Sequence, residues 1–326
     1  MTTVERLDPR DGEQFAAFHG AYLAAHDDEW DRPYSAQERR AELLDDSSYT
    51  VTHGVLARDV SGHVVGSGVV ELPLKDNLTL AYIEVAVPPE HRRRGHGTAI
   101  LRGLEEIAVD AGRTALFAEV RWPADADASA RTAFAEARGF RRDLVDAHRV
   151  LDLPASLPEA PVRDGYSLRA WRGPCPPEWV DQYAGLLSLL VQEAPSGDYP
   201  LENEFFDAER VRRDEQLLVA QGRVMQVAVA VADDGRLAAH TQLVFSESDP
   251  DNVYQWDTLV LPEHRGHGLG LSLKILAMRE SADLLEGRRY VHTFNAATNG
   301  PMIAVNDAMG FRLVGWLGEY VRELEA

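Results

Sequence analysis

The spacing of hydrophobic residues divides the chain into strands and helices. Short runs that alternate apolar and polar residues predict half-buried strands, whereas apolar residues spaced by three and four predict amphipathic helices. Strands are expected at 3–7, 49–57, 63–72, 78–87, 115–120, 148–153, 166–170, 223–232, 237–245, 253–261, 290–294 and 315–324. Helices are expected from residue 11, before residue 112, and at 35–44, 128–137, 177–193, 205–221, 269–285 and 301–309. Strands and helices therefore interleave along the whole chain, as in a mixed α/β fold.

Two short motifs occur twice along the chain. Segment 89–97 reads PEHRRRGHG, and segment 262–270 reads PEHRGHGLG, which puts Arg92 and Arg265 at a separation of 265 − 92 = 173 residues. Gly139-Phe140-Arg141 recurs as Gly310-Phe311-Arg312, and 310 − 139 = 171. Two motifs that recur at nearly the same offset indicate a duplicated domain.

Each glycine-rich loop lies between an expected strand and an expected amphipathic helix. The first N–H groups of a helix have no partner within it, and the helix dipole adds positive charge there. Glycines let such a backbone approach a phosphate closely. The Walker string Gly-x-x-x-x-Gly-Lys-Ser/Thr does not occur in the chain. The Gly-x-Gly-x-x-Gly fingerprint does not fit, because the sixth position from Gly266 is Leu271. The remaining alternative to an anion site is an ordinary strand-to-helix turn.

The pattern Arg265-x-x-Gly268-x-Gly270 resembles the pyrophosphate loop of the GNAT N-acetyltransferase superfamily. The repeated Gly-Phe, which follows the loop helix at a similar interval in that family, extends the resemblance to both halves. The resemblance implies a tandem, duplicated GNAT protein of bacterial type, with each domain a mixed, mostly antiparallel sheet flanked by helices. The expected domains are 1–153 and 163–326, joined by a proline-rich linker at 154–162.

Composition and charge restrict the class of protein. The chain has 326 residues, which fits two domains, and no apolar run approaches the length that spans a bilayer. Its polar start is unlike a signal peptide, and the single Cys175 excludes an internal disulfide, so a cytoplasmic protein is expected. The net charge of −20 disfavours nucleic acid and anionic membranes as partners. A monomer or homodimer that acts on a small-molecule amine is expected.

The resemblance implies acetyl-CoA as the acyl donor, without a metal. In the family, the strand before the loop holds the pantetheine arm through its backbone, and the loop holds the pyrophosphate. In the second half the matching residues are Leu259, Val260, Leu261, His264, Arg265, Gly266, His267, Gly268, Leu269, Gly270, Asn295 and Asn299. In the first half they are Val87, Arg92, Arg93, Arg94, Gly95, His96, Gly97 and Thr98. The two loop arginines either support the loop or face solvent.

Candidate catalytic residues follow from the same positions. Asp257 and Glu84 each lie eight residues before a loop arginine, where family members often keep the general base that deprotonates the amine. The alternative is that these carboxylates face solvent or cap a neighbour. The family's acidic tyrosine is replaced by Asn306, and Tyr320 on the last strand is a candidate substitute. In the first half, Ala128 and Ala135 replace the matching asparagine and tyrosine, so catalysis is expected in the second half.

The expected function is acetyl-CoA-dependent N-acetylation of a small-molecule amine. Two alternatives remain at this point: a non-catalytic acyl-CoA-binding or regulatory protein, and acyl or aminoacyl transfer from another donor on the same fold.

Overall fold

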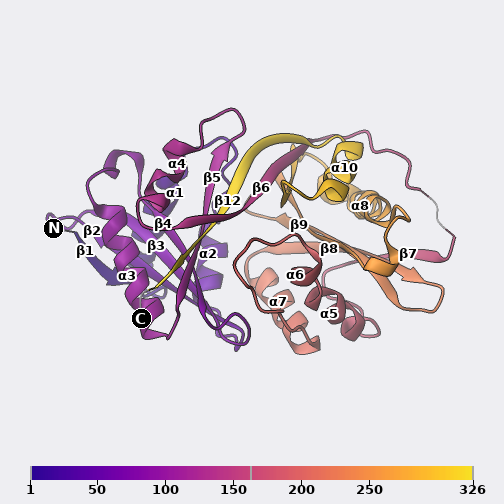
Figure 1. The fold of residues 1–326 in the computed structure, drawn as a ribbon, viewed down its shortest axis with the longest axis horizontal. Helices are drawn as coiled ribbons and strands as arrows, with labels where there is room; N and C mark the ends of the chain where they lie inside the picture. The colour runs from indigo at the N-terminus through magenta and orange to yellow at the C-terminus, as the bar shows by residue number, and fades with distance from the viewer. Residues whose placement is uncertain (1, 162–163, 325–326) are drawn as a thin grey trace. The chain divides into compact units, whose positions relative to one another are not determined.

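The computed structural model describes residues 2–161 and 164–324. Contacts divide the chain into two compact units (Figure 1). Unit 1 comprises Met1–Leu144 and Leu317–Ala326, and unit 2 comprises Val145–Trp316.

Unit 1 is a sheet with helices on both faces. Its strands are ordered β1-β2-β3-β4-β5-β12. The strands are β1 (Thr3–Arg6), β2 (Thr50–Arg58), β3 (Val64–Pro73), β4 (Leu80–Ala86), β5 (Ala115–Pro123) and the end of β12 (Arg312–Glu323). The helices are α1 (Gly12–Ala25), α2 (Ala36–Leu43), α3 (His96–Asp110) and α4 (Ser129–Glu136). The pairs from β1 to β4 are antiparallel, whereas β4 and β5 are parallel.

Unit 2 repeats this plan. Its strands are ordered β6-β11-β10-β9-β8-β7, with β10 and β11 parallel. The strands are β6 (Arg141–Asp152), β7 (Tyr166–Arg172), β8 (Arg223–Ala232), β9 (Leu237–Ser246), β10 (Asn252–Val260) and β11 (Tyr290–Ala296). The helices are α5 (Val180–Ser188), α6 (Leu190–Glu193), α7 (Ala208–Ala220), α8 (Leu269–Glu280), α9 (Ala282–Leu285) and α10 (Gly300–Met309).

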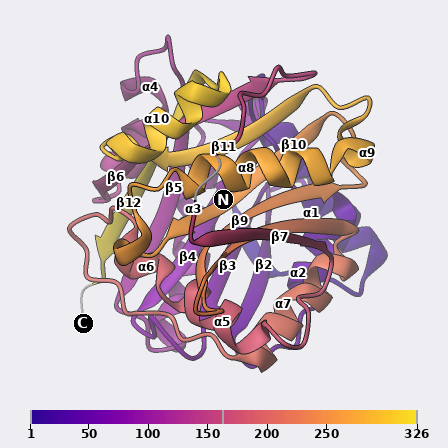
Figure 2. The same ribbon diagram turned by 90° about the vertical axis from the view of Figure 1, so that its right-hand side faces the viewer.

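Each sheet buries its two faces in separate cores. In unit 2, α8 packs on Leu243 and Val253, whereas Tyr183 of α5 and Val211 of α7 pack on Val227 from the opposite face. Figure 2 shows α8 on one side of β7 and β9, with α5 and α7 on the other side. These two faces correspond to alternate positions along β9 and β10, as the two-residue period of a strand requires. The expected mixed α/β class, with a sheet flanked by helices, is confirmed.

The compact units do not coincide with the two segments expected from sequence. Residues 145–152 of β6 belong to unit 2, where they pair with β11 from Asp146↔Ala296 to Asp152↔Tyr290. The end of β12 belongs to unit 1, where Leu324 N donates to Thr114 O over 2.8 Å. The boundary expected at 153 therefore lies inside the structure of unit 2. The expected linker, 154–162, extends by one residue beyond the described residues.

Most expected elements are present, with differences at their ends. The helix expected at 35–44 begins at a capping box, since the Ser35 side chain accepts from Glu38 N and the Glu38 side chain accepts from Ser35 N. The helices expected at 177–193 and 269–285 are each divided in two, at Leu189 and Ser281. Strands expected at 148–153 and 315–324 begin earlier, at Arg141 and Arg312. Apolar and polar residues do not alternate regularly at the starts of these two strands, so the sequence pattern did not predict them.

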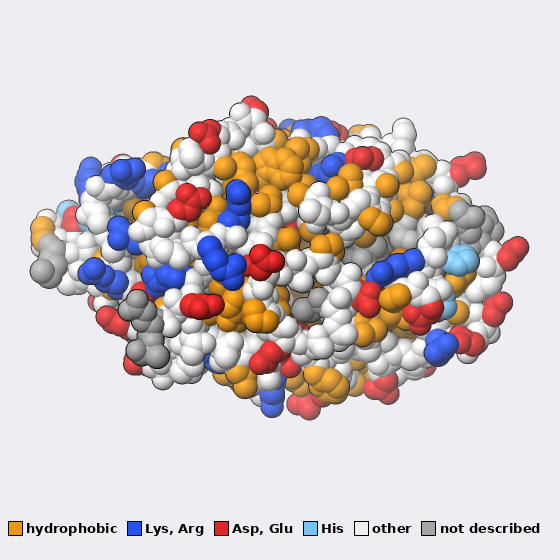
Figure 3. Space-filling model, in the orientation of Figure 1, with side chains coloured by type: hydrophobic (Ala, Val, Ile, Leu, Met, Phe, Trp, Pro, Cys, Tyr) orange, Lys and Arg blue, Asp and Glu red, His pale blue; other side chains and the backbone are white. Residues whose placement is uncertain are grey.

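The surface charge, the hydropathy of the helices and the possible metal ligands complete the description of the fold. On the face drawn in Figure 3, acidic and basic side chains are interspersed with hydrophobic ones. None of the described helices has both the length and the apolar character needed to cross a membrane. Among the described residues, no group of three or more His, Cys, Asp or Glu side chains is placed to hold a metal ion.

Candidate active site

The two glycine loops have the same backbone course. Each begins with a 3₁₀ turn, Pro89–His91 or Pro262–His264. Gly266 and Gly268 then adopt φ angles of 82° and 68°, and their counterparts Arg93 and Gly95 adopt 64° and 87°. Helices α3 and α8 start directly after the second of these residues, and no side chain caps either start. The first N–H groups of both helices are therefore free of side-chain caps, as an anion site requires.

The loop arginines support the loops. Arg92 Nε donates to Val87 O over 3.0 Å, and Arg265 Nε donates to Val260 O over 3.2 Å. Each guanidinium also forms an ion pair. Arg92 pairs with Asp27, which follows α1, at 3.0 Å, and Arg265 pairs with Glu193 of α6 at 2.5 Å. Of the two roles expected for these arginines, the structure therefore shows loop support.

The loop histidines lie against their own units. His264 Nδ1 is 2.9 Å from the Tyr166 hydroxyl, and the His267 ring packs on Tyr166. His96 Nδ1 is 2.8 Å from the Thr2 hydroxyl. Burial, followed by the charges of His91 and Arg94, lowers the pKa of His96, which favours its neutral form. These histidines shape the loops, and His96 adds little fixed positive charge to its own loop.

The other loop residues that were expected to bind acetyl-CoA lie in and beside the glycine loops. Leu269 is buried in the core, so only its backbone is available to a ligand. Gly270 and Gly97 begin the helices with their neighbours, and a Cβ on Gly97 would meet the Phe134 ring at 3.3 Å. Arg94 is exposed and Thr98 is half-buried. The backbone geometry of the loop is thus shared by both units.

Strands β10 and β11 diverge beside the second loop. Their parallel ladder runs from Asn252↔Tyr290 to Gln255↔Thr293, after which β10 continues with β9 and β11 continues with β6. Leu261 N donates to Ala238 O on β9. Because antiparallel bonding alternates by residue, the backbone N–H groups of Thr258 and Val260 point away from β9. The N–H groups of these two residues are free to bind an extended ligand that lies beside β10. Leu261, which was expected to bind the pantetheine arm, cannot use its N–H for this, because that N–H already bonds to Ala238 O.

A β-bulge carries the first candidate base. The β9–β10 register shifts between Gln255 and Thr258, so Asp257 lies in a two-residue bulge opposite Gln242. Burial, and in second place the charge of Glu204, raises the pKa of the Asp257 carboxyl to about 6. Desolvation raises an acid's pKa because it disfavours the charged form. A carboxylate with a pKa near 6 is a stronger base than an ordinary aspartate and is still ionised at neutral pH.

Three buried polar residues beside Asp257 were not expected from sequence. Gln242 Nε2 donates to the Tyr183 hydroxyl over 2.7 Å, and the Tyr183 ring packs edge-on against His240. Burial raises the pKa of Tyr183, with a smaller contribution from the charge of Asp257. Burial lowers the pKa of His240 to about 4, so its ring is neutral. Sequence reasoning missed these residues because none of them belongs to a recognised motif. The sequence indicated only that His240 and Gln242 are polar residues within an apolar strand.

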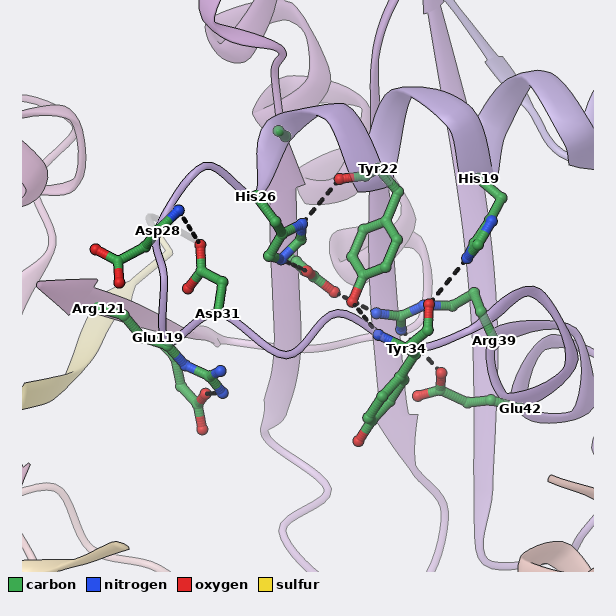
Figure 4. Close-up of polar contacts among 12 residues, drawn as sticks. His19, Tyr22, His26, Asp28, Asp31, Tyr34, Arg39, Glu42, Glu119 and Arg121 are labelled. Atoms are coloured by element: carbon green, nitrogen blue, oxygen red, sulfur yellow. Dashed lines mark hydrogen bonds and ion pairs between the residues drawn. The ribbon is translucent and has the colours of Figure 1, made fainter. Parts of the chain in front are cut away.

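Glu84, the second candidate base, has different surroundings. The β3–β4 ladder is regular through Val69↔Glu84, without a bulge. Glu84 Oε2 accepts from Arg39 Nη2 at 2.6 Å, and His26 Nε2 lies 3.7 Å from Glu84 Oε1. Arg39 is held between Tyr22 and Tyr34 (Figure 4). Glu84 is therefore already paired with an internal cation.

Asn306 does not lie where a catalytic acid could reach a ligand. Its side chain is fully buried, accepts from Lys274 Nζ at 2.8 Å and donates to Asn295 Oδ1 at 2.9 Å. Asn295, an expected donor-site residue, is itself buried in this network and donates to Ala296 O. Burial lowers the pKa of Lys274 to about 7. The expected acid position is thus part of a structural polar cluster, and Lys274 was not anticipated.

Tyr320 and Asn299 also differ from expectation. Tyr320 belongs to unit 1, where it is fully buried in the core formed with α3, whereas Asp257 belongs to unit 2. The fold of unit 2 therefore does not supply Tyr320 as a general acid to act with Asp257. The Asn299 side chain accepts from Met302 N at 3.2 Å and so caps α10. Its position in the family motif is explained here by helix capping.

Cys175 has the environment of an inert thiol. It is buried, and Cys175 N donates to Glu215 Oε1 at 2.7 Å. Burial, followed by the charge of Glu215, raises the pKa of the Cys175 thiol to about 12. A thiol at that pKa has almost no thiolate at neutral pH and is a poor nucleophile.

The chain matches known acetyltransferases over both halves. The model of the acetyltransferase (GNAT) family matches residues 15–140 and 186–311. A mycothiol acetyltransferase of Salinispora tropica is 27% identical over 94% of this chain and 93% of its own. One from Thermomonospora curvata is 28% identical over 70% of this chain and 69% of its own.

A solved structure shares the tandem architecture. The tandem GNAT protein from the clavulanic acid biosynthesis pathway has a TM-score of 0.83 and 28% identity, covering 100% of this chain and 99% of its own. A GNAT acetyltransferase from Sphaerobacter thermophilus, with a TM-score of 0.66 and 18% identity, covers 100% of this chain and 96% of its own and shows the same fold. With matching loops, strands and family models in both halves, the chain belongs to the acetyltransferase (GNAT) family as a tandem member.

Proposed function

We propose that the protein transfers the acetyl group of acetyl-CoA to an amine of a small molecule, and that unit 2 performs the transfer. The observation that carries this proposal is the position of the Asp257 carboxyl group. It lies in the bulge of β10, just beyond the point where β10 and β11 diverge, on the strand that leads into the second glycine loop. A base, a backbone edge and an uncapped helix start thus follow one another along 14 residues, 257–270.

The chemistry divides between these parts. The start of α8 binds the pyrophosphate, and the outward N–H groups of Thr258 and Val260 hold the pantetheine arm. Asp257 takes a proton from the acceptor's ammonium group, directly or through a water. The freed nitrogen lone pair bonds to the acetyl carbonyl carbon, the carbon–sulfur bond breaks, and the CoA sulfur leaves as thiolate. The nitrogen then releases its second proton to the thiolate, which gives the neutral amide and the CoA thiol. No tyrosine of the family's usual kind is needed, since thiolate is a tolerable leaving group.

The charge around the site favours a cationic acceptor. Glu204 lies near enough to raise the pKa of Asp257, and it bonds to Arg210 at 3.2 Å. Relatives named for mycothiol and a structural neighbour named for clavulanic acid support a small-molecule acceptor. Because those names point to different acceptors, we propose only the shared class, a small amine that is protonated in solution.

Two measurements test this proposal on the full-length chain. Calorimetry should detect acetyl-CoA binding, and the absence of binding at about 1 mM ligand, equivalent to about −4 kcal/mol, would contradict it. A thiol-release assay with a panel of primary amines should then show release above the rate without amine. Binding without release for any amine in the panel would favour the non-catalytic acyl-CoA-binding alternative.

A further inference from the structure

Unit 1 holds a buried guanidinium against Glu84, the residue that matches Asp257. The Arg39 side chain is 4% exposed, and its two terminal nitrogens lie 2.6 Å from Glu84 Oε2 and 2.8 Å from Glu42 Oε2. The ring centroids of Tyr22 and Tyr34 are 4.7 and 4.8 Å from its central carbon. Two carboxylates and two aromatic faces are the groups by which proteins recognise an organic cation.

The groups around Arg39 are fixed by their own hydrogen bonds (Figure 4). The Tyr22 hydroxyl accepts from Tyr34 N at 3.0 Å, and His26 Nδ1 lies 2.8 Å from Tyr22 O. His19 Nε2 lies 2.9 Å from Tyr34 O. These residues come from α1 and the segment before α2, on the sheet face that carries Glu84. The cradle is therefore preformed by unit 1 and does not depend on Arg39 alone.

Unit 2 contains the same arginine but uses it differently. Arg39 and Glu42 recur as Arg212 and Glu215, at the offset of 173 that also relates Glu84 to Asp257. Arg212 binds Glu215 at 2.7 Å, but its other nitrogen donates to Cys175 O at 2.7 Å and not to Asp257. Among the described residues, Asp257 has no ion-pair partner. No arginine therefore binds Asp257 in the described part of unit 2 as Arg39 binds Glu84 in unit 1.

We propose that Glu84, Tyr22 and Tyr34 form an acceptor-type site for organic cations in unit 1, and that Arg39 occupies this site as a built-in ligand. The site would take alkylguanidinium or alkylammonium groups once the Arg39 side chain is removed. The inference rests on the proposed function in one respect, that the matching carboxylate of unit 2 receives the acceptor's ammonium. It explains why unit 1 keeps a glycine loop and a base-position carboxylate without an open acceptor site.

The test replaces the built-in cation with a free one. Arg39→Ala should melt at a lower temperature than the natural protein, because Glu84 and Glu42 lose their partner. Ethylguanidinium at about 10 mM should then raise the melting temperature of Arg39→Ala by about 3 °C, with a saturable dependence on concentration. The same salt should raise the melting temperature of the natural protein by less, because Arg39 fills the unit 1 site and the cation can bind only at the acceptor site proposed for unit 2.

Two variants control for general salt and stability effects. Arg39→Ala with Glu84→Gln removes the carboxylate that holds the cation and should show no rise beyond that of the natural protein. Arg212→Ala removes the matching arginine of unit 2 and should respond as the natural protein does, because the Arg212 side chain binds Glu215 and Cys175 O and does not fill a cation site. An equal response of all four proteins would overturn the proposal.

Failure of Arg39→Ala to fold does not leave the question open. The cation should then restore cooperative melting to Arg39→Ala, and an absence of restoration counts against the site. The measurement contains no acetyl-CoA and no amine acceptor for unit 2. A negative result therefore contradicts the unit 1 site alone, whereas the thiol-release assay contradicts the proposed function alone.

Discussion

At the residue scale, two carboxylates at equivalent positions differ through their surroundings. Asp257 lies in a bulge and is desolvated, which raises its pKa to about 6. Glu84 lies in a regular ladder and is bound by Arg39 at 2.6 Å. The same sequence offset therefore yields one carboxylate that is able to accept a proton near neutral pH and one that is neutralised by a fixed cation.

The backbone of Arg93 offers a stability test at this scale. Arg93 adopts φ 64° where its counterpart Gly266 adopts 82°. A side chain in the left-handed region costs about 1 kcal/mol, whereas glycine adopts it readily. We expect Arg93→Gly to raise the free energy of unfolding by up to about 1 kcal/mol and Gly266→Ala to lower it by about 1 kcal/mol. Denaturant titration measures both changes, and a loss of stability in Arg93→Gly would contradict the strain.

Sequence reasoning could place the two carboxylates but not their environments. The offset from the loop arginine identified Asp257 and Glu84, because a strand and a loop keep their spacing in both copies. The partner Arg39 lies 45 residues from Glu84 and in another element, so only the folded chain reveals the pair. The bulge at Asp257 was likewise hidden, since one inserted residue leaves no compositional signal.

At the element scale, helix α8 is anchored by a buried lysine. Lys274 is 1% exposed, donates to Asn306 of α10 and lies 5.7 Å from the Phe311 ring. The α8–α10 contact thus holds the helix of the glycine loop against the helix that follows β11. Among the residues that the structure describes, Lys274 Nζ has only the neutral Asn306 amide as a hydrogen-bond partner, which compensates poorly for the lost hydration of an ammonium group.

This lysine should make stability depend on pH. Burial lowers the pKa of Lys274 from its usual 10.5 to about 7. Between these values the unfolded chain binds the extra proton, so the contribution of this group to stability rises with pH from about 7 to 10.5. Lys274→Met removes the titration. We therefore expect the variant to gain more stability over the natural protein at pH 6 than at pH 9, by a few kcal/mol at most.

Urea titrations at the two pH values measure that difference. Lys274→Met loses the bond to Asn306 at both pH values, so the comparison between them isolates the charge. An equal stability difference at pH 6 and pH 9 would show that Lys274 keeps its ordinary pKa.

At the scale of the whole molecule, the two units exchange strands. Residues 145–152 of the first repeat pair in unit 2, and the last ten residues of the chain belong to unit 1. The repeat offset predicted two copies correctly, because internal similarity reports equivalent residues. It could not report which copy a terminal strand joins, since both sheets offer the same kind of edge at that position.

The exchange predicts how the chain can be divided. A fragment of residues 163–326 lacks β6 and leaves the edge of β11 unpaired, so we expect it to aggregate. A fragment of residues 141–316 retains β6 and omits the end of β12, so it should give more soluble protein with cooperative melting. Soluble yield and thermal unfolding compare the two. A soluble, cooperatively melting 163–326 fragment would show that β6 is dispensable for unit 2.

The proposed role of Asp257, as the base with which unit 2 acetylates an amine, is tested most directly by kcat/KM of matched variants. Asp257→Asn keeps the shape but removes basicity, so we expect kcat/KM to fall by about 10²-fold at pH 7, with acetyl-CoA affinity little changed. The defect should shrink at high pH, where more of the amine is already neutral. The natural enzyme should lose activity below about pH 6, as Asp257 takes up a proton. Glu84→Gln, compared at equal folded fraction, should stay within a few-fold; loss of turnover in Glu84→Gln with normal turnover in Asp257→Asn would contradict the account.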